Sequence, residues 1–240
     1  QATASAGALP GSYSLRVDAL AQHQTLVTAP LPGADALVGG GSLTITFGTG
    51  DGGAFVPDPE RAPVQVVVPA GATLAQVRDA INSAGAGIGA TLVNDEAGTR
   101  LMVRSAESGE AQAFRIDAVD DGSGAGGLGL VALAYAPGDA AGAITRIQAA
   151  SNAQVEFNGL ALSLASNSAN DLLENVSFTF HQVSANPVTV DITTDTEAVR
   201  AGIDEFVNAY NELNSLVRSQ TGYDPATRVA GPLQGNQTVT

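Results

Sequence analysis

Two glycine-rich stretches are the first places where residue types and spacing could do chemistry. The spacing G-x-G-x-x-G occurs at Gly48, Gly50 and Gly53 and again at Gly122, Gly124 and Gly127. In a dinucleotide site such glycines open a helix whose N-terminal amides face a pyrophosphate. Pro57 and Pro59 prevent a helix after the first stretch, and no charged residue lies at the ribose spacing after the second. Chance matches are expected among 28 glycines, so we predict no nucleotide site.

The two histidines are the only candidates for a catalytic base of the serine-hydrolase type. His23 and His181 both lie in strand-like segments, and neither has serine and aspartate residues arranged near it. A catalytic triad needs all three groups. We therefore interpret both histidines as surface or interface residues.

Acidic residues could bind a metal or act in pairs as acid and base. Asp117, Asp120 and Asp121 precede a glycine, but an EF-hand needs acids at alternate positions and a later glutamate. We interpret them as a solvated turn. Asp95 and Glu96 lie at an expected hairpin tip, where a raised pKa is not expected. The sequence thus predicts a protein that is not an enzyme, with no catalytic residue, no metal and no cofactor.

Composition narrows the possible partners. The net charge is −14, every basic residue is Arg, and Cys is absent. Such an acidic surface repels phosphate backbones and anionic lipid, so we expect neither nucleic acid nor membrane as a partner. No run reaches the roughly 18 apolar residues of a membrane span. The sequence begins at Gln1 without Met or an export signal, and we expect it to be part of a longer protein.

The first half of the chain predicts a compact module of strands and one helix. Alternation predicts a strand at 13–17 that could continue through Leu26 and Val27. Thr73 and Gln76 have the spacing of a capping box, which predicts a helix that Gly85 ends. Its expected buried face is Leu74, Val77 and Ile81. The other expected strands are 43–47, 64–68, 90–93, 100–104 and 114–117.

The second half predicts a smaller module of the same plan. Asn158-Gly159 is a strong hairpin signal between strands at 155–157 and 160–164. A short helix is expected over Ala169–Glu174. Two alternating strands are expected after it, at 176–180 and 188–192.

Glycine-rich breaks near 39–42 and 137–143 bracket the first module and predict an insertion. The expected fold is α+β, mainly β, with two small sheet-rich head domains, one inserted in the other, followed by a long C-terminal helix. The expected limits are 10–42 plus 144–193 for one head domain, 43–142 for the inserted one, and 194–240 for the helix and tail. A serial arrangement of the same modules stays open.

The C-terminal helix, expected over Thr194–Thr221, carries an apolar face without an evident partner. Thr194 and Glu197 have capping-box spacing, Asp195 adds charge to the first turn, and Gly222 and Pro225 follow the end. Apolar residues recur at steps of four and three, as in a coiled coil. They are Val199, Ile203, Phe206, Tyr210, Leu213 and Val217. The partner is another copy, a shared globular surface or a helix outside this sequence; the alternative is the sheet of the helix's own domain.

Several stretches resemble bacterial flagellar filament-capping proteins, the hook-associated protein two family. They are 195–199, 203–213, 221–224 and 231–236 in the tail, 11–17 and 20–22 near the start, and 73–82 with 100–103 in the middle. The middle module also resembles one found in some flagellins. Residues 48–63 and 120–143 match no motif.

The resemblance implies a structural role outside the cell. Family members form a small ring of identical subunits, about four to six, at the filament tip. The head domains make the ring, leg-like helices reach the filament, and flagellin folds beneath. Flagellin and other hook-associated proteins are then the expected partners, and export would use the flagellar type III pathway. The terminal coiled-coil segments would lie outside this sequence. A flagellin-like filament subunit and a secreted adhesin are the alternatives.

Overall fold

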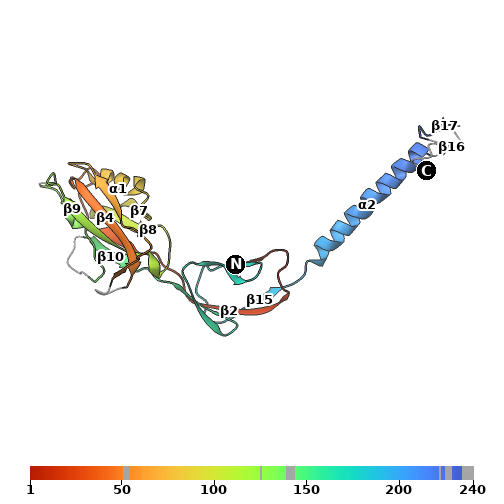
Figure 1. Cartoon of the computed structure of the whole chain (residues 1–240), viewed down its shortest axis with the longest axis horizontal. Coiled ribbons are helices and arrows are strands. Elements are labelled where there is room, and N and C mark those ends of the chain that lie inside the picture. Colours follow the sequence, from red (N-terminus) through yellow and green to blue (C-terminus); the bar gives the residue numbers. More distant parts are fainter. Residues whose placement is uncertain (51–54, 125, 139–143, 222, 225–228, 234–240) are drawn as a thin grey trace. The chain divides into compact units, whose positions relative to one another are not determined.

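The structure is a computed structural model that describes residues 1–50, 55–124, 126–138, 144–221, 223–224 and 229–233. The chain divides into two compact units, Gln1–Ile192 and Thr193–Thr240 (Figure 1). The first unit contains two hydrophobic cores, which define a first head and a second head. The predicted class, mainly β with a long C-terminal helix, is confirmed.

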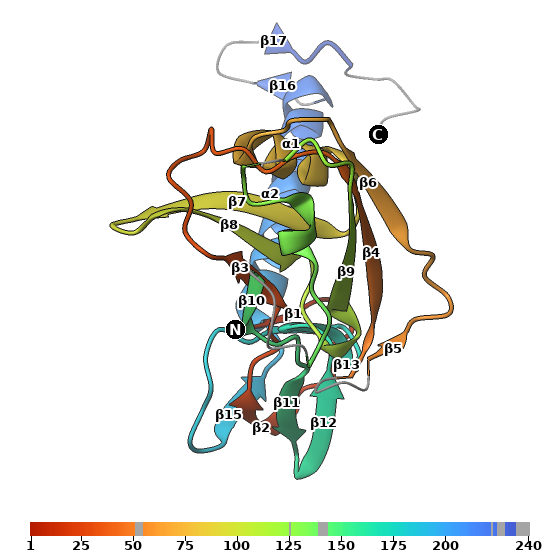
Figure 2. The same cartoon turned by 90° about the vertical axis from the view of Figure 1, so that its left-hand side faces the viewer.

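The described residues of the first head form two sheets, one helix and two 3-10 turns. Its elements are β3 (Thr25–Thr28), β4 (Gly41–Thr49), β5 (Val56–Pro57), β6 (Val64–Val68), α1 (Leu74–Ser83), β7 (Ile88–Asp95), β8 (Gly98–Ser105), η1 (Glu110–Gln112), β9 (Ala113–Asp120), η2 (Leu130–Leu133) and β10 (Ile144–Gln148). One sheet has the order β10-β3-β8-β7. In the other, β4 lies between β9 and β6, and β5 pairs with the end of β4 (Figure 2).

Strand β4 shows how alternation makes this core. Leu43, Ile45 and Phe47 are at most 2% exposed, and they alternate with more polar residues along the strand. The strand pairs with the whole of β9, from Gly41–Asp120 to Gly48–Ala113. Because side chains alternate between the two faces, a single strand provides three core residues.

Helix α1 follows the prediction closely. The Gln76 amide donates to Thr73 Oγ1 at 3.4 Å, and the Thr73 amide donates to Gln76 Oε1 at 2.9 Å, which is the predicted capping box. Leu74, Val77 and Ile81 are buried, as expected. Gly85 follows the C-cap with φ of 59°, a left-handed conformation that ends a helix at little steric cost.

The second head is a smaller pair of sheets. Its elements are β1 (Ala2–Ala4), β2 (Gly11–Ala19), β11 (Ala153–Phe157), β12 (Leu160–Leu164), β13 (Ser168–Leu173), β14 (Val176–Thr179) and β15 (Val188–Ile192). A four-stranded sheet has the order β12-β11-β2-β15, as Figure 2 shows, and a three-stranded sheet has the order β1-β14-β13. Asn158 and Gly159 have φ of 49° and 84°, which confirms the predicted hairpin turn.

The predicted helix over Ala169–Glu174 is wrong. These residues lie mostly in strand β13, which pairs antiparallel with β14 from Ser168–Thr179 to Leu173–Val176. Ala169 is 8% exposed and belongs to the second core. Pairing with the strand that follows directly therefore overrode the local helical preference, and the two modules do not share one order of elements.

The predicted continuation of the first strand through Leu26 and Val27 is also wrong. Strand β2 ends at Ala19, and these residues form β3, which pairs with β8 and β10 in the first head. Leu26 and Ile144 belong to the first core, whereas Ala21 and Ala153 belong to the second. The chain therefore passes between the cores within 21–26 and again within 144–153. The expected domain limits stay a prediction. These crossings suggest that the inserted domain begins earlier than residue 43.

Candidate functional site on the C-terminal helix

Helix α2 (Thr196–Thr221) is the main element of the second unit, together with the short strands β16 (Tyr223–Asp224) and β17 (Val229–Ala230). The Ala198 amide donates to Asp195 Oδ1 at 2.9 Å. Asp195 is thus the N-terminal cap, one residue later than the predicted Thr194, because its carboxylate both accepts this bond and interacts well with the helix dipole. The predicted stop residues, Gly222 and Pro225, lie outside the described residues.

The predicted apolar face of α2 lies open in this unit. Val199, Ile203, Tyr210 and Leu213 are 58–59% exposed, and Phe206 is 71% exposed. Val217, the last residue of the predicted set, is half-buried. No residue of α2 is buried. The structure therefore brings the predicted residues onto one helix, and what covers them stays a prediction.

The apolar face is wider than a strict coiled-coil seam. With Ile203 at heptad position a and Phe206 at position d, Val207 takes position e and Leu216 position g. Val207 is 46% exposed and Leu216 is 56% exposed. An apolar face that spreads to e and g is typical of helices that pack in bundles or on a broad surface.

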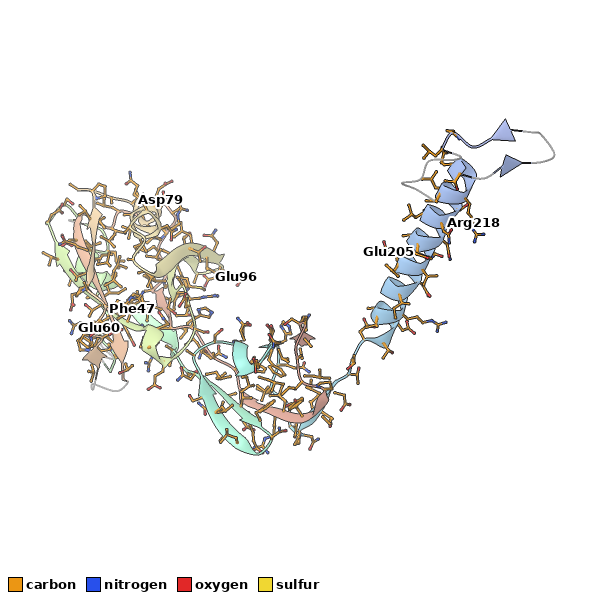
Figure 3. The ribbon with its side chains drawn as sticks, turned by 45° about the vertical axis from the view of Figure 1, so that its right-hand side comes forward. Phe47, Glu60, Asp79, Glu96, Glu205 and Arg218 are labelled. Carbon is orange, nitrogen blue, oxygen red and sulfur yellow. The ribbon has the colours of Figure 1, made fainter. Side chains whose placement is uncertain are left out.

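Charged, uncharged polar and small residues occupy the rest of the helix surface. Figure 3 labels Glu205 and Arg218, which fall at positions c and b, outside the a/d stripe. Glu197 lies in the first turn and Arg218 in the last, both favourable with the helix dipole. The site can therefore bury apolar surface on one side while the other side stays solvated. Each large apolar side chain transferred to a partner contributes up to about 1.5–3 kcal/mol before the costs of association.

The second glycine motif packs backbone against backbone. A Cβ atom added at Gly124 would lie 2.4 Å from the Val38 carbonyl oxygen, and one at Gly127 would lie 2.2 Å from that of Leu37. These positions require glycine for close contact between two loops. At the first motif, a Cβ atom on Gly48 would lie 2.1 Å from the Val56 carbonyl oxygen, and Gly53 is outside the described residues. Close packing explains these glycines without a nucleotide.

The acidic turn is held by its own backbone amides. Asp120 Oδ1 accepts from the Gly122 amide and Asp120 Oδ2 from the Leu130 amide, both at 2.7 Å. A hydrogen bond from Ser123 lowers the pKa of Asp121. Within the described ranges, no three His, Cys, Asp or Glu side chains gather as metal ligands would. Among all the residues that the structure describes, no helix is long and apolar enough to cross a membrane.

Both histidines lie outside the strands, next to them rather than within them as predicted. His23 Nδ1 lies 3.0 Å from the Ser105 carbonyl oxygen, and Arg104 Nη2 lies 3.2 Å from His23 Nε2. A guanidinium can only donate, so the neutral ring with its proton on Nδ1 satisfies both contacts. His181 follows β14 and is exposed.

One buried polar residue escaped the sequence analysis. Gln24 is fully buried; its Nε2 donates to the Phe114 carbonyl at 2.7 Å, and its Oε1 accepts from the Phe114 amide at 3.2 Å. It therefore joins the chain just before β3 to strand β9 of the other sheet. No local pattern marks a contact between residues 90 positions apart.

Comparison with known protein families gives two matches along the chain. The model described as flagellar hook-associated protein 2 C-terminus matches residues 150–240, and the flagellin hook IN motif matches residues 42–107. The first match covers the second head from β11 onward together with α2. The second covers β4 to β8 of the first head.

Individual relatives match nearly the whole chain. The B-type flagellar hook-associated protein 2 of Pseudomonas aeruginosa PAO1 is 32% identical over 98% of this chain and 49% of the relative. The flagellar hook-associated protein 2 of Escherichia coli K12 is 30% identical over 99% of the chain and 50% of the relative. The chain thus spans about half the length of the curated relatives it matches.

Solved structures agree with these matches. The crystal structure of FliD (HAP2) from P. aeruginosa PAO1 has a TM-score of 0.74 and 30% identity, and the match covers 93% of this chain and 97% of that one. The D1-D2-D3 domains of the E. coli flagellar cap protein FliD give a TM-score of 0.78 with 29% identity, covering 100% of this chain and 63% of that one. The fold is thus that of the head domains of a structural flagellar protein. The chain belongs to the flagellar hook-associated protein 2 family.

Proposed function

We propose that the full-length protein caps the tip of a bacterial flagellar filament and promotes polymerisation of flagellin there. The observation that carries this proposal is the family match over nearly the entire chain, including both heads and α2. The solved E. coli relative is a flagellar cap protein by name.

The proposed mechanism is confinement by a closed ring of identical subunits. A ring covers the filament end and holds emerging flagellin subunits at high local concentration while they fold. Weak contacts between heads suffice when several act together, because linked sites gain from effective concentration. Closed symmetry limits the assembly to a cap, whereas an open contact would produce a fibre. A ring of about four to six copies is the expected size.

The open face of α2 is proposed as a contact that the assembled protein covers. The exposed residues, from Val199 to Leu213, place several large apolar side chains on one stripe. An apolar stripe of this size is unfavourable in water and is typical of an interaction surface. The partner we propose is helical, either from the same protein or from a neighbouring copy, and flagellin and other hook-associated proteins are the further partners. The site of action is the filament tip, reached through the flagellar type III export pathway.

The function is tested by deletion of the gene in its own bacterium. Cells should lose motility and release unpolymerised flagellin into the medium, and the full-length gene should restore both. Normal filaments in a deletion strain that carries no other cap gene would contradict the proposal.

The role of the α2 face is tested separately in the full-length protein. Phe206→Asp places a charge in the middle of the apolar face and should abolish complementation. Asn208→Asp adds the same charge on the same turn at heptad position f, outside the face. Secretion of both variants should be equal. Equal complementation by the two variants would show that the face has no partner in the cap.

A further inference from the structure

The second head has a cavity of about 460 Å³ between its two sheets. Its apolar lining includes Leu15, Val17, Phe178, Phe180, Val188 and Val190. The cavity has a structural cause, because the sheet with β2 and β15 has four strands whereas the covering sheet has three. On β15, Val188 is left 53% exposed as a result.

The N-terminal end of strand β1 lies at the opening of this cavity. Gln1 and Ala2 line it, and β1 pairs antiparallel with β14 in the register Ala2–Phe178. The Gln1 amino group donates to the Thr179 carbonyl at 2.7 Å, and the Thr179 amide donates to the Gln1 carbonyl at 2.8 Å. Continued in the same register, the position before Gln1 faces Phe180 and the one before that faces His181.

The backbone beyond Thr179 has free hydrogen-bonding groups on this side. The Phe180 amide points to the opposite neighbour and donates to the Asn167 carbonyl at 2.7 Å. In an extended segment the next amide points the other way. In the described part of the chain, the His181 amide and carbonyl have no hydrogen-bond partner. They are the next pair of groups in the β1–β14 ladder.

We propose that the residues preceding Gln1 in a longer form of this protein continue β1 along Phe180 and His181 and close this cavity. The residue directly before Gln1 faces the same side as Ala2 and Phe180, because paired residues in a sheet share a face. Phe180 is 6% exposed and points into the core. That residue therefore points its side chain into the cavity, whose lining favours an apolar side chain, and the residue before it points to solvent while its backbone pairs with His181.

The extension is short for a structural reason. After His181 the chain turns towards the other sheet, where the Ser184 amide donates to the Val17 carbonyl and Ser184 Oγ accepts from the Val17 amide, both at 2.9 Å. This crossing closes that end of the cavity. The added segment thus gains one ladder pair and one buried side chain before it leaves the head.

Hydrogen exchange on the protein as it is and on a form lengthened by its own preceding residues tests the proposal. Exchange of the His181 amide should slow by about 100-fold in the longer form, because a ladder bond opens only with the sheet around it. The Thr179 amide, already paired, serves as the internal control. The slowing should be independent of protein concentration.

The alternation of side chains gives a second, independent readout. In the longer form, aspartate in place of the residue directly before Gln1 should lower the melting temperature of the heads and restore fast exchange at His181. Aspartate one position earlier should leave both unchanged. Fast exchange of His181 in the longer form would overturn the proposal. So would equal effects of the two substitutions, or protection that appears only at high concentration, which would assign the cavity to a second copy.

Discussion

Helices α1 and α2 carry the same kind of apolar stripe and differ completely in burial. Leu74, Val77 and Ile81 of α1 are at most 1% exposed. The corresponding stripe of α2 includes Ile203 and Phe206, which are 58% and 71% exposed. Both faces could be predicted equally well from the spacing of apolar residues in the sequence. The comparison teaches that periodicity identifies the face of a helix but not the surface that covers it.

The difference in burial follows from the structure that surrounds each helix within its own unit. Helix α1 has 10 residues and lies between β6 and β7 in the chain. Its buried face belongs to the same core as theirs, that of the first head. Helix α2 has 26 residues, and among the described residues of its own unit only the two-residue strands β16 and β17 accompany it. A helix on its own in water is marginal even when its sequence favours helix, because most helical stability in proteins comes from packing. The face of α2 thus points to a contact beyond its own unit, as proposed above.

The largest expected effect is the loss of a buried side chain from α1. Ile81→Ala removes a core residue that is 1% exposed, and the surrounding sheets cannot collapse fully around the gap. The free energy of unfolding of the heads, measured in denaturant, should fall by about 2–5 kcal/mol. Asp79, exposed on the same helix and labelled in Figure 3, gives the control, and Asp79→Ala should change stability by about 0.5 kcal/mol or less. Equal effects of the two substitutions would mean that the α1 face is not packed as described.

The caps of the two helices sharpen the comparison at a smaller scale. Thr73→Ala removes the capping box of α1 and should cost the heads about 1 kcal/mol, because α1 folds as part of their core. Asp195→Ala removes the cap of α2 and should reduce helical circular dichroism without moving the melting transition of the heads. A common shift in melting temperature for both variants would show that α2 and the heads unfold together.

Local features of both heads could be predicted from the sequence. The capping box at Thr73, the strand at 64–68 and the turn at Asn158 each rest on residues within one short stretch, and all three are present. For each, propensity and packing favour the same structure, so a short window is sufficient. The residues that form the apolar stripe of α2 could be predicted for the same reason.

Pairing between distant segments could not be predicted. The small residues of β1 give no strand signal, yet they pair with β14 more than 170 positions away. Gln24 is a polar residue just before β3, and no local pattern indicates that its side chain is buried against Phe114, 90 positions away. Such contacts depend on topology, which a single sequence does not encode in any one window.

The hairpin of β7 and β8 offers a weaker, electrostatic test within the heads. Arg100 Nε donates to Asp95 Oδ2 at 2.8 Å, and this bond, followed by that from the Ala97 amide, lowers the pKa of Asp95. A lowered folded-state pKa stabilises the fold above the carboxyl's unfolded pKa, and this contribution disappears as the pH falls through the folded pKa. Arg100→Gln should therefore make melting temperature fall slightly less steeply as the pH is lowered from about 5 to 2. An unchanged pH profile would mean that solvent already screens this exposed pair.

The smallest expected effect is the most informative one for α2. Phe206→Ala removes the most exposed of the large apolar side chains of the helix, which is 71% exposed in this unit. The melting transition of the heads should therefore stay where it is in dilute solution, in contrast to the shift caused by Ile81→Ala. If Phe206 instead packed on a head, its loss would cost about 3–5 kcal/mol. Melting curves followed by near-ultraviolet and far-ultraviolet circular dichroism at several concentrations separate the two cases. A large drop that persists on dilution would place α2 against its own heads and end the contrast with α1, whereas a drop only at high concentration would show that copies of the chain cover the face for one another.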